Sequence, residues 1–146
     1  MLYCCKCHKW AYKTHKCDIM SLIPLKREMR PVVDALFDLG FEILSSSCFT
    51  TPMNVSVYER RITLEVEFKY QYPIMEILRD LPAGWKYHTE VVGADWPISV
   101  LAYIETYMWP AYETAEKRIN QIVTELVDYL GTRDKDALQS IMMLID

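Results

Sequence analysis

Apolar and polar side chains alternate most regularly in the middle of the chain, between positions 62 and 69. A period of two is the pattern of a strand that buries one face and exposes the other. The segment therefore predicts a strand in a half-solvated sheet. Its apolar members are Ile62, Leu64, Val66 and Phe68, and its polar members are Thr63, Glu65, Glu67 and Lys69.

Two other segments have the spacing of amphipathic helices. The first covers positions 26–39, where Pro31 fits only a first turn and Gly40 suits a left-handed cap at the end. The second is a C-terminal helix that ends at Gly131, after which Thr132 can begin a further helix. The apolar stripe of the second helix consists of Tyr112, Ala115, Ile119, Ile122, Val123, Leu126 and Leu130.

The remaining segments complete an α+β pattern. Strands are predicted over 19–23, 41–49 and 85–92, a short helix over 73–81, and either a strand or a helix over 98–107. The first six elements then follow the order β-α-β-β-α-β, which matches a ferredoxin-like split β-α-β antiparallel sheet with helices on one face. Three parts are expected: a zinc-knuckle module (1–17), a ferredoxin-like domain (18–107) and a C-terminal helical extension on the same core (108–146).

Composition narrows the class of protein. The 146 residues suffice for one hydrophobic core. No apolar run reaches the roughly 18–20 residues of a membrane span, and lysines, histidines and cysteines interrupt the N-terminal segment where a signal peptide would be apolar. We therefore expect a cytoplasmic protein with no membrane partner. The net charge of −4 is uneven, because the first 30 residues balance to +5 and the remaining 116 to −9.

Four of the five cysteines lie within the first 17 residues, an odd and clustered set that favours metal ligation over a disulfide framework. Cys4-x2-Cys7 is followed by His15-x-Cys17, and a Cys-x2-Cys turn presents two thiolates to one zinc ion. With four protein ligands the site is closed to water, so the zinc would be structural. The alternative ligands Cys5 and His8 stay open.

Basic and aromatic residues surround this cluster. They suit a phosphate backbone with stacked bases, but they also suit a soluble knuckle whose aromatic rings cover the metal site. The acidic remainder of the chain favours the second interpretation and a protein partner. The residues concerned are Lys6, Lys9, Trp10, Tyr12, Lys13 and Lys16.

Cys48 follows three serines at the end of a predicted strand. A thiol there is a nucleophile if a base such as His88 lowers its pKa, whereas a lone cysteine in a strand is more often a small core residue. Aromatic residues are dense after Trp85, a feature of both cores and interfaces, and this leaves a homodimer open.

The segment from Tyr3 to Trp85 resembles a loose group of small proteins of Firmicute bacteria and their phages. The shared layout is the knuckle, a helix of the form V..L...G, a strand ending in Ser-Cys, and an LP.GW turn. In this chain these are Val33 to Gly40, Ser47-Cys48 and Leu81-Pro82-Ala83-Gly84-Trp85.

The group continues its Ser-Cys with Ser-Gly-His, similar to a motif of wybutosine-synthesis methyltransferases, but here Phe49-Thr50-Thr51 follow. The resemblance therefore implies a non-catalytic phage or prophage accessory protein that binds a host or viral macromolecule, with anti-defence inhibition as one role. A zinc-knuckle regulator that binds nucleic acid and an enzyme using Cys48 are the alternative hypotheses.

Overall fold

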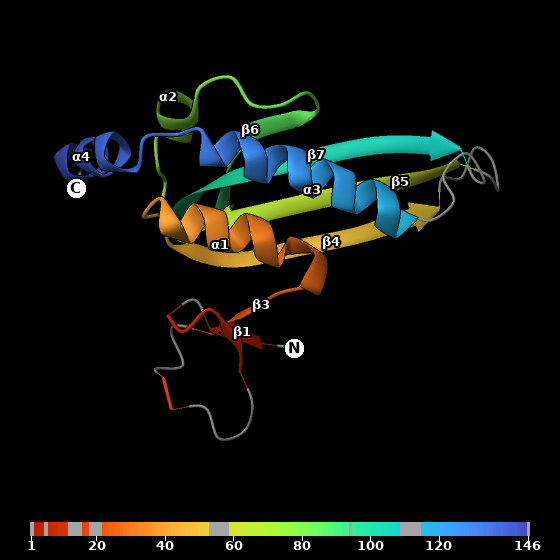
Figure 1. Cartoon of the computed structure of the whole chain (residues 1–146), viewed down its shortest axis with the longest axis horizontal. Coiled ribbons are helices and arrows are strands. Elements are labelled where there is room, and N and C mark those ends of the chain that lie inside the picture. Colours follow the sequence, from red (N-terminus) through yellow and green to blue (C-terminus); the bar gives the residue numbers. More distant parts are fainter. Residues whose placement is uncertain are drawn as a thin grey trace.

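The computed structural model describes residues 2–4, 6–11, 16–17, 22–52, 59–93, 95–108 and 115–145. Within them the chain is a mixed α+β protein with two antiparallel sheets (Figure 1). The strands are β1 (Leu2–Cys4), β2 (Lys9–Trp10), β3 (Leu22–Pro24), β4 (Ile43–Pro52), β5 (Glu59–Phe68), β6 (Trp85–Val92) and β7 (Trp96–Met108). The helices are α1 (Arg30–Asp38), preceded by a 3-10 turn at Arg27–Met29, α2 (Ile74–Leu78), α3 (Ala115–Gly131) and α4 (Lys135–Ile145).

The larger sheet has the order β4-β5-β7-β6, and α1 and α3 lie over one of its faces (Figure 1). The alternation of β5 explains this arrangement, because its four apolar side chains are fully buried while the intervening polar ones are only partly covered. Each of the four helices adds buried residues to the same apolar cluster, from Val32 on α1 to Leu138 on α4. The opposite face of the sheet, here called the open face, carries no helix among the described residues.

The ferredoxin-like topology is not confirmed. The strand expected at 19–23 is found as β3, and it pairs with β1 in a separate three-stranded sheet of order β2-β1-β3. β3 covers the described residues 22–24, and positions 19–21 of the expected strand lie outside the described residues. The segment over 98–107 is a strand, β7, which fills the centre of the sheet between β5 and β6.

The other expected elements are confirmed with shifted ends. The strand expected at 41–49 runs on to Pro52, the helix expected at 73–81 is confined to α2, and the strand at 85–92 has the expected bounds. Tyr112 of the C-terminal stripe lies outside the described residues, whereas Ile119, Ile122 and Leu126 are buried as expected. No described helix is both long and apolar enough to cross a membrane.

An ion pair fastens α3 to the sheet. The Arg118 guanidinium donates to both carboxylate oxygens of Glu105 on β7, at 2.8 Å from Nε and 2.5 Å from Nη2. The Tyr103 hydroxyl donates to the same carboxylate at 2.9 Å. Burial, together with this bond to a carboxylate, raises the pKa of Tyr103 to about 12. Tyr103 is thereby held in one position at the centre of the sheet.

Gly84 makes the closest approach to that tyrosine. It lies in a turn closed by a 3.2 Å hydrogen bond from the Trp85 amide to the Pro82 carbonyl, and its φ is +91°. A Cβ added at Gly84 would lie 2.4 Å from Cε2 of Tyr103. Gly93 also has a positive φ, +60°, but a Cβ there would meet no atom within 4 Å.

We predict that Gly84→Ala lowers the free energy of unfolding by about 2–4 kcal/mol, because the left-handed backbone and the clash with Tyr103 both oppose the new methyl group. Gly93→Ala, the control, has only the backbone cost of about 1–2 kcal/mol. Urea denaturation of the two variants measures the difference. Equal losses would show that Tyr103 does not constrain this turn.

Candidate metal centre

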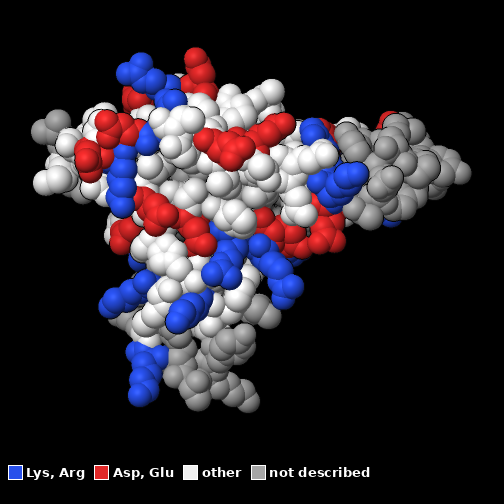
Figure 2. Space-filling view, viewed as in Figure 1, with Lys and Arg blue, Asp and Glu red and all other residues white. Residues whose placement is uncertain are grey.

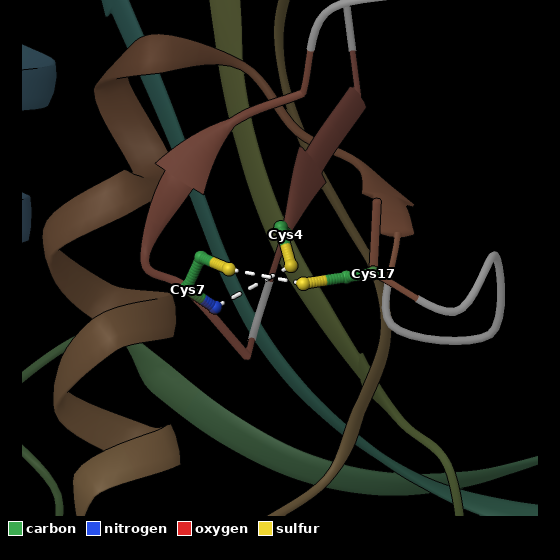
Figure 3. A group of neighbouring side chains, drawn as sticks. All are labelled: Cys4, Cys7 and Cys17. Carbon is green, nitrogen blue, oxygen red and sulfur yellow. Dashed lines mark hydrogen bonds between the residues drawn. The ribbon is translucent and has the colours of Figure 1, made fainter. Parts of the chain in front are cut away.

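The N-terminal sheet brings three cysteine side chains together. Cys4 is the last residue of β1, Cys7 lies in the turn that leads to β2, and Cys17 comes from the segment between β2 and β3. Their sulfur atoms all lie within 4.8 Å of one another and point toward a common centre (Figure 3). The structure thus assembles three of the four ligands expected from the sequence, drawn from three separate stretches of chain.

Two hydrogen bonds from backbone amides close the turn between Cys4 and Cys7. The backbone amide of Cys7 donates to Sγ of Cys4 at 3.4 Å, and the amide of His8 donates to the Cys4 carbonyl at 2.9 Å. His8 takes a left-handed backbone, with φ of +57°, which reverses the chain into β2. An amide that points at a cysteine sulfur favours the thiolate form, which is the form that ligates metal.

The spacing of the sulfur atoms fits a metal ion better than a disulfide. Sγ of Cys7 and Sγ of Cys17 are 3.0 Å apart, well beyond the roughly 2.05 Å of an S–S bond. Tetrahedral zinc with ligands at about 2.3 Å separates its sulfur atoms by about 3.8 Å. Cys4, Cys7, Cys17 and the remote Cys48 form no disulfide. An ion would need the cluster to open by less than about 1 Å.

The cluster also has the electrostatics of an apo metal site. The neighbouring thiol of Cys7, then desolvation and Cys4, raise the pKa of Cys17 to about 11. A metal ion binds the deprotonated thiolate, so metal binding at such a cluster releases protons and depends on pH.

The fourth ligand expected from the sequence, His15, lies outside the described residues, as does the alternative ligand Cys5. The other alternative ligand, His8, lies within the described residues, and its side chain contacts helix α1 instead of the cysteines. Its Nδ1 lies 2.9 Å from Oδ1 of Asp34, and its ring packs edge-on against Phe37 at 5.2 Å between centroids. Among the described residues, His8 is not part of the thiol cluster.

Asp34 joins this module to the main domain. Its Oδ1 accepts the hydroxyl of Tyr3 and faces the ring of His8, while its Oδ2 lies 3.5 Å from Nε of Arg30. Arg30 also donates to the backbone carbonyl of His8 at 2.9 Å and lies over the Tyr3 ring. We call this set of four residues, Tyr3, His8, Arg30 and Asp34, the Asp34 latch. Sequence analysis missed it, and the only local signal was the i, i+4 spacing of Arg30 and Asp34 on one helix.

The basic residues around the cluster divide into two groups. Lys6, Lys9 and Lys16 are exposed, and the described residues of this lobe show basic side chains and no acidic one on the face in Figure 2. Trp10 is instead half-buried, in edge-on contact with Tyr3 at 5.3 Å, so it packs against the core rather than standing free to stack on bases. Tyr12 and Lys13 lie outside the described residues.

Cys48 and His88 do not meet. Cys48 is only 4% exposed and belongs to the apolar cluster beneath the helices, where burial, and then the carboxylate of Glu28, raise its pKa to about 11. His88 lies on the open face, with Nε2 3.1 Å from Glu90. Opposite faces of one sheet separate the two side chains, so the arrangement needed for a Cys48 nucleophile with His88 as its base is absent.

Comparison with known proteins adds no relative, since no family model, curated protein or solved structure matches this chain. The site is therefore defined by its own geometry. That geometry is a cluster of three thiols on a small sheet, attached to α1 by the Asp34 latch, with a basic outer surface.

We predict that Asp34→Asn lowers the free energy of unfolding by about 1–3 kcal/mol, because it leaves Tyr3 and His8 without a charged acceptor. The side chain is 29% exposed, so solvent screening places the loss toward the lower end. Asp38→Asn, on the exposed side of the same helix, is the matched control and should change stability by less than about 0.5 kcal/mol. Urea denaturation measures both, and similar values for the two variants would contradict the latch.

Proposed function

We propose that this chain is a non-catalytic protein that binds a macromolecule. One structural zinc ion would hold its N-terminal module together. The observation that carries the proposal is the convergence of Cys4, Cys7 and Cys17 on one centre. Three sulfur donors favour zinc or another thiophilic ion over magnesium or calcium. A fourth ligand, His15 in our proposal, would close the coordination sphere and leave no position for a reacting water.

The setting of the site supports a structural role for the metal. The module is small, with strands of two or three residues, and such a sheet cannot bury enough apolar surface to be stable alone. A metal ion and the Asp34 latch supply the missing stability from opposite sides: the ion ties β1 to the segments around β2, and the latch ties the same strand to α1.

Two features support a protein partner over nucleic acid. The chain beyond residue 30 carries a net charge of −9, which repels phosphate. The open face also exposes Phe49 and Ile104, which the strand register places on either side of Thr63. The layout shared with small Firmicute and phage proteins supports an accessory role in the host cytoplasm, with inhibition of a host defence protein as one form of it.

The exposed lysines of the module support a second candidate function, nucleic-acid binding. Lys6, Lys9 and Lys16 lie on the same lobe as the thiol cluster, and three phosphate contacts would give a binding constant that falls steeply with salt. This candidate would place the zinc in the same structural role, so the metal does not distinguish the two functions.

We predict one zinc ion per purified chain and its loss in Cys7→Ser. Cys7 is exposed, so the substitution removes a ligand without opening a cavity in the core. Cys48→Ser, far from the cluster, keeps the metal and is the control. Elemental analysis gives the stoichiometry, and a chelator should lower the unfolding temperature of the wild type and of Cys48→Ser but leave that of Cys7→Ser unchanged. Retention of zinc by Cys7→Ser would contradict the proposed zinc site. A zinc-free wild-type chain with a Cys7–Cys17 disulfide would contradict it as well.

We predict that gel filtration with a Firmicute host lysate shows the chain in a complex that resists nuclease and changes little between about 50 and 200 mM salt. A complex lost on nuclease treatment, and weakened by Lys6→Glu, Lys9→Glu and Lys16→Glu together, identifies the nucleic-acid function instead. Lys86→Glu, on the main sheet, is the control for a charge reversal outside the module. Elution as an unaltered single chain at micromolar concentration would contradict both functions.

A further inference from the structure

A second set of metal-ligating side chains lies on the open face of the main sheet, away from the cysteines. Its members are Glu65 on β5 with His88 and Glu90 on β6, and their ligand atoms lie within 4.8 Å of one another. The set mixes one imidazole with two carboxylates, two donor types that first-row divalent ions accept together. Neither the thiol cluster nor the proposed function makes use of these residues.

The register of the sheet explains how strands that are not neighbours meet. β7 lies between β5 and β6, and it places Ala102 beside Glu65, Val100 beside His88, and Ile98 beside Glu90. The alanine is small, so it leaves space above the middle strand. Long side chains from both sides can extend into this space, which spans roughly 10 Å between the outer backbones.

The burial of β7 provides independent support for this convergence. Ile98 and Val100 are fully buried although no described helix lies over the open face. The side chains that flank them in the register are Glu67 and His88 beside Val100, and Glu90 beside Ile98. Ile98 and Val100 therefore form an apolar floor in this part of the open face, with His88 and Glu90 beside it in the register.

Charge crowding is present at the same place. Nε2 of His88 is 3.1 Å from Oε1 of Glu90, and both side chains remain about two-fifths exposed, at 39% and 40%. A cation in the centre would relieve the repulsion between the carboxylates.

We propose that Glu65, His88 and Glu90 form a second, solvent-open site for a divalent transition-metal ion. The protein supplies three donors from one side, and the exposed side leaves coordination positions for water or for an oxygen ligand of a bound partner. This site differs from the thiol cluster in its donors, since oxygen and imidazole nitrogen accept manganese, which thiolates bind poorly. The proposal is independent of the proposed function, and neither needs the other to hold.

Manganese is therefore the probe that separates the two sites. Titration of the full purified chain with Mn²⁺, followed by the electron paramagnetic resonance signal of the free ion, should show one saturable site. His88→Ala and Glu65→Gln should each weaken binding about tenfold or more, as expected when a ligand is removed. Glu59→Gln, on the same face of β5 but at the other end of the strand, is the matched control and should weaken it less than about threefold.

Localisation of the ion provides the second readout. Bound Mn²⁺ should broaden the amide resonances of Val100 and Ala102 in the nuclear magnetic resonance spectrum more than those of β1 and β2. Absence of saturable binding below about 1 mM would overturn the proposal, and so would equal weakening by Glu59→Gln and His88→Ala, which would indicate diffuse attraction to an acidic surface.

Discussion

The arrangement of the N-terminal half depends on one carboxylate. Asp34 projects from α1 and receives the Tyr3 hydroxyl, the His8 ring and the Arg30 guanidinium. Tyr3 and Cys4 are neighbours on one short strand, and both are fully buried although they point to opposite sides of it. Tyr3 is fixed to the main core through Asp34, so the thiol of Cys4 is held on the other side, facing Cys7 and Cys17. The latch and the thiol cluster are therefore two consequences of the position of one strand.

The sheet imposes a similar division on the rest of the molecule. Side chains that alternate along β5 face either the helices or the open face, and the register extends that division to β4, β6 and β7. Cys48 and Leu64 pair on the helix side, whereas Glu65 and His88 lie on the other. Cys48 and His88, which the sequence analysis considered as a nucleophile and its base, are thus separated by the thickness of the sheet.

The sequence predicted the parts of the fold that depend on local patterns. The alternation in β5, the apolar stripe of α3 and the Cys-x2-Cys turn each specify a structure within a few residues, and each is confirmed within the described residues. Strand order depends on pairings between distant segments, for which the sequence has no local signal, and there the ferredoxin-like prediction was not confirmed. The Asp34 latch and the set of Glu65, His88 and Glu90 were missed for the same reason, since both join residues from separate elements.

The basic surface of the module follows from the proposed zinc site itself. Three thiolates and one zinc ion carry a net charge of about −1, and a buried cysteine such as Cys4 holds that charge close to apolar surroundings. Lys9 lies opposite Cys4 in the register, and Lys6 and Lys16 are the immediate neighbours of Cys7 and Cys17 in the chain. Positive charges at these positions offset the net negative charge that the occupied site would carry. A lysine-rich lobe is therefore expected around a thiolate site even where no nucleic acid is bound, and its charge alone is weak support for that function.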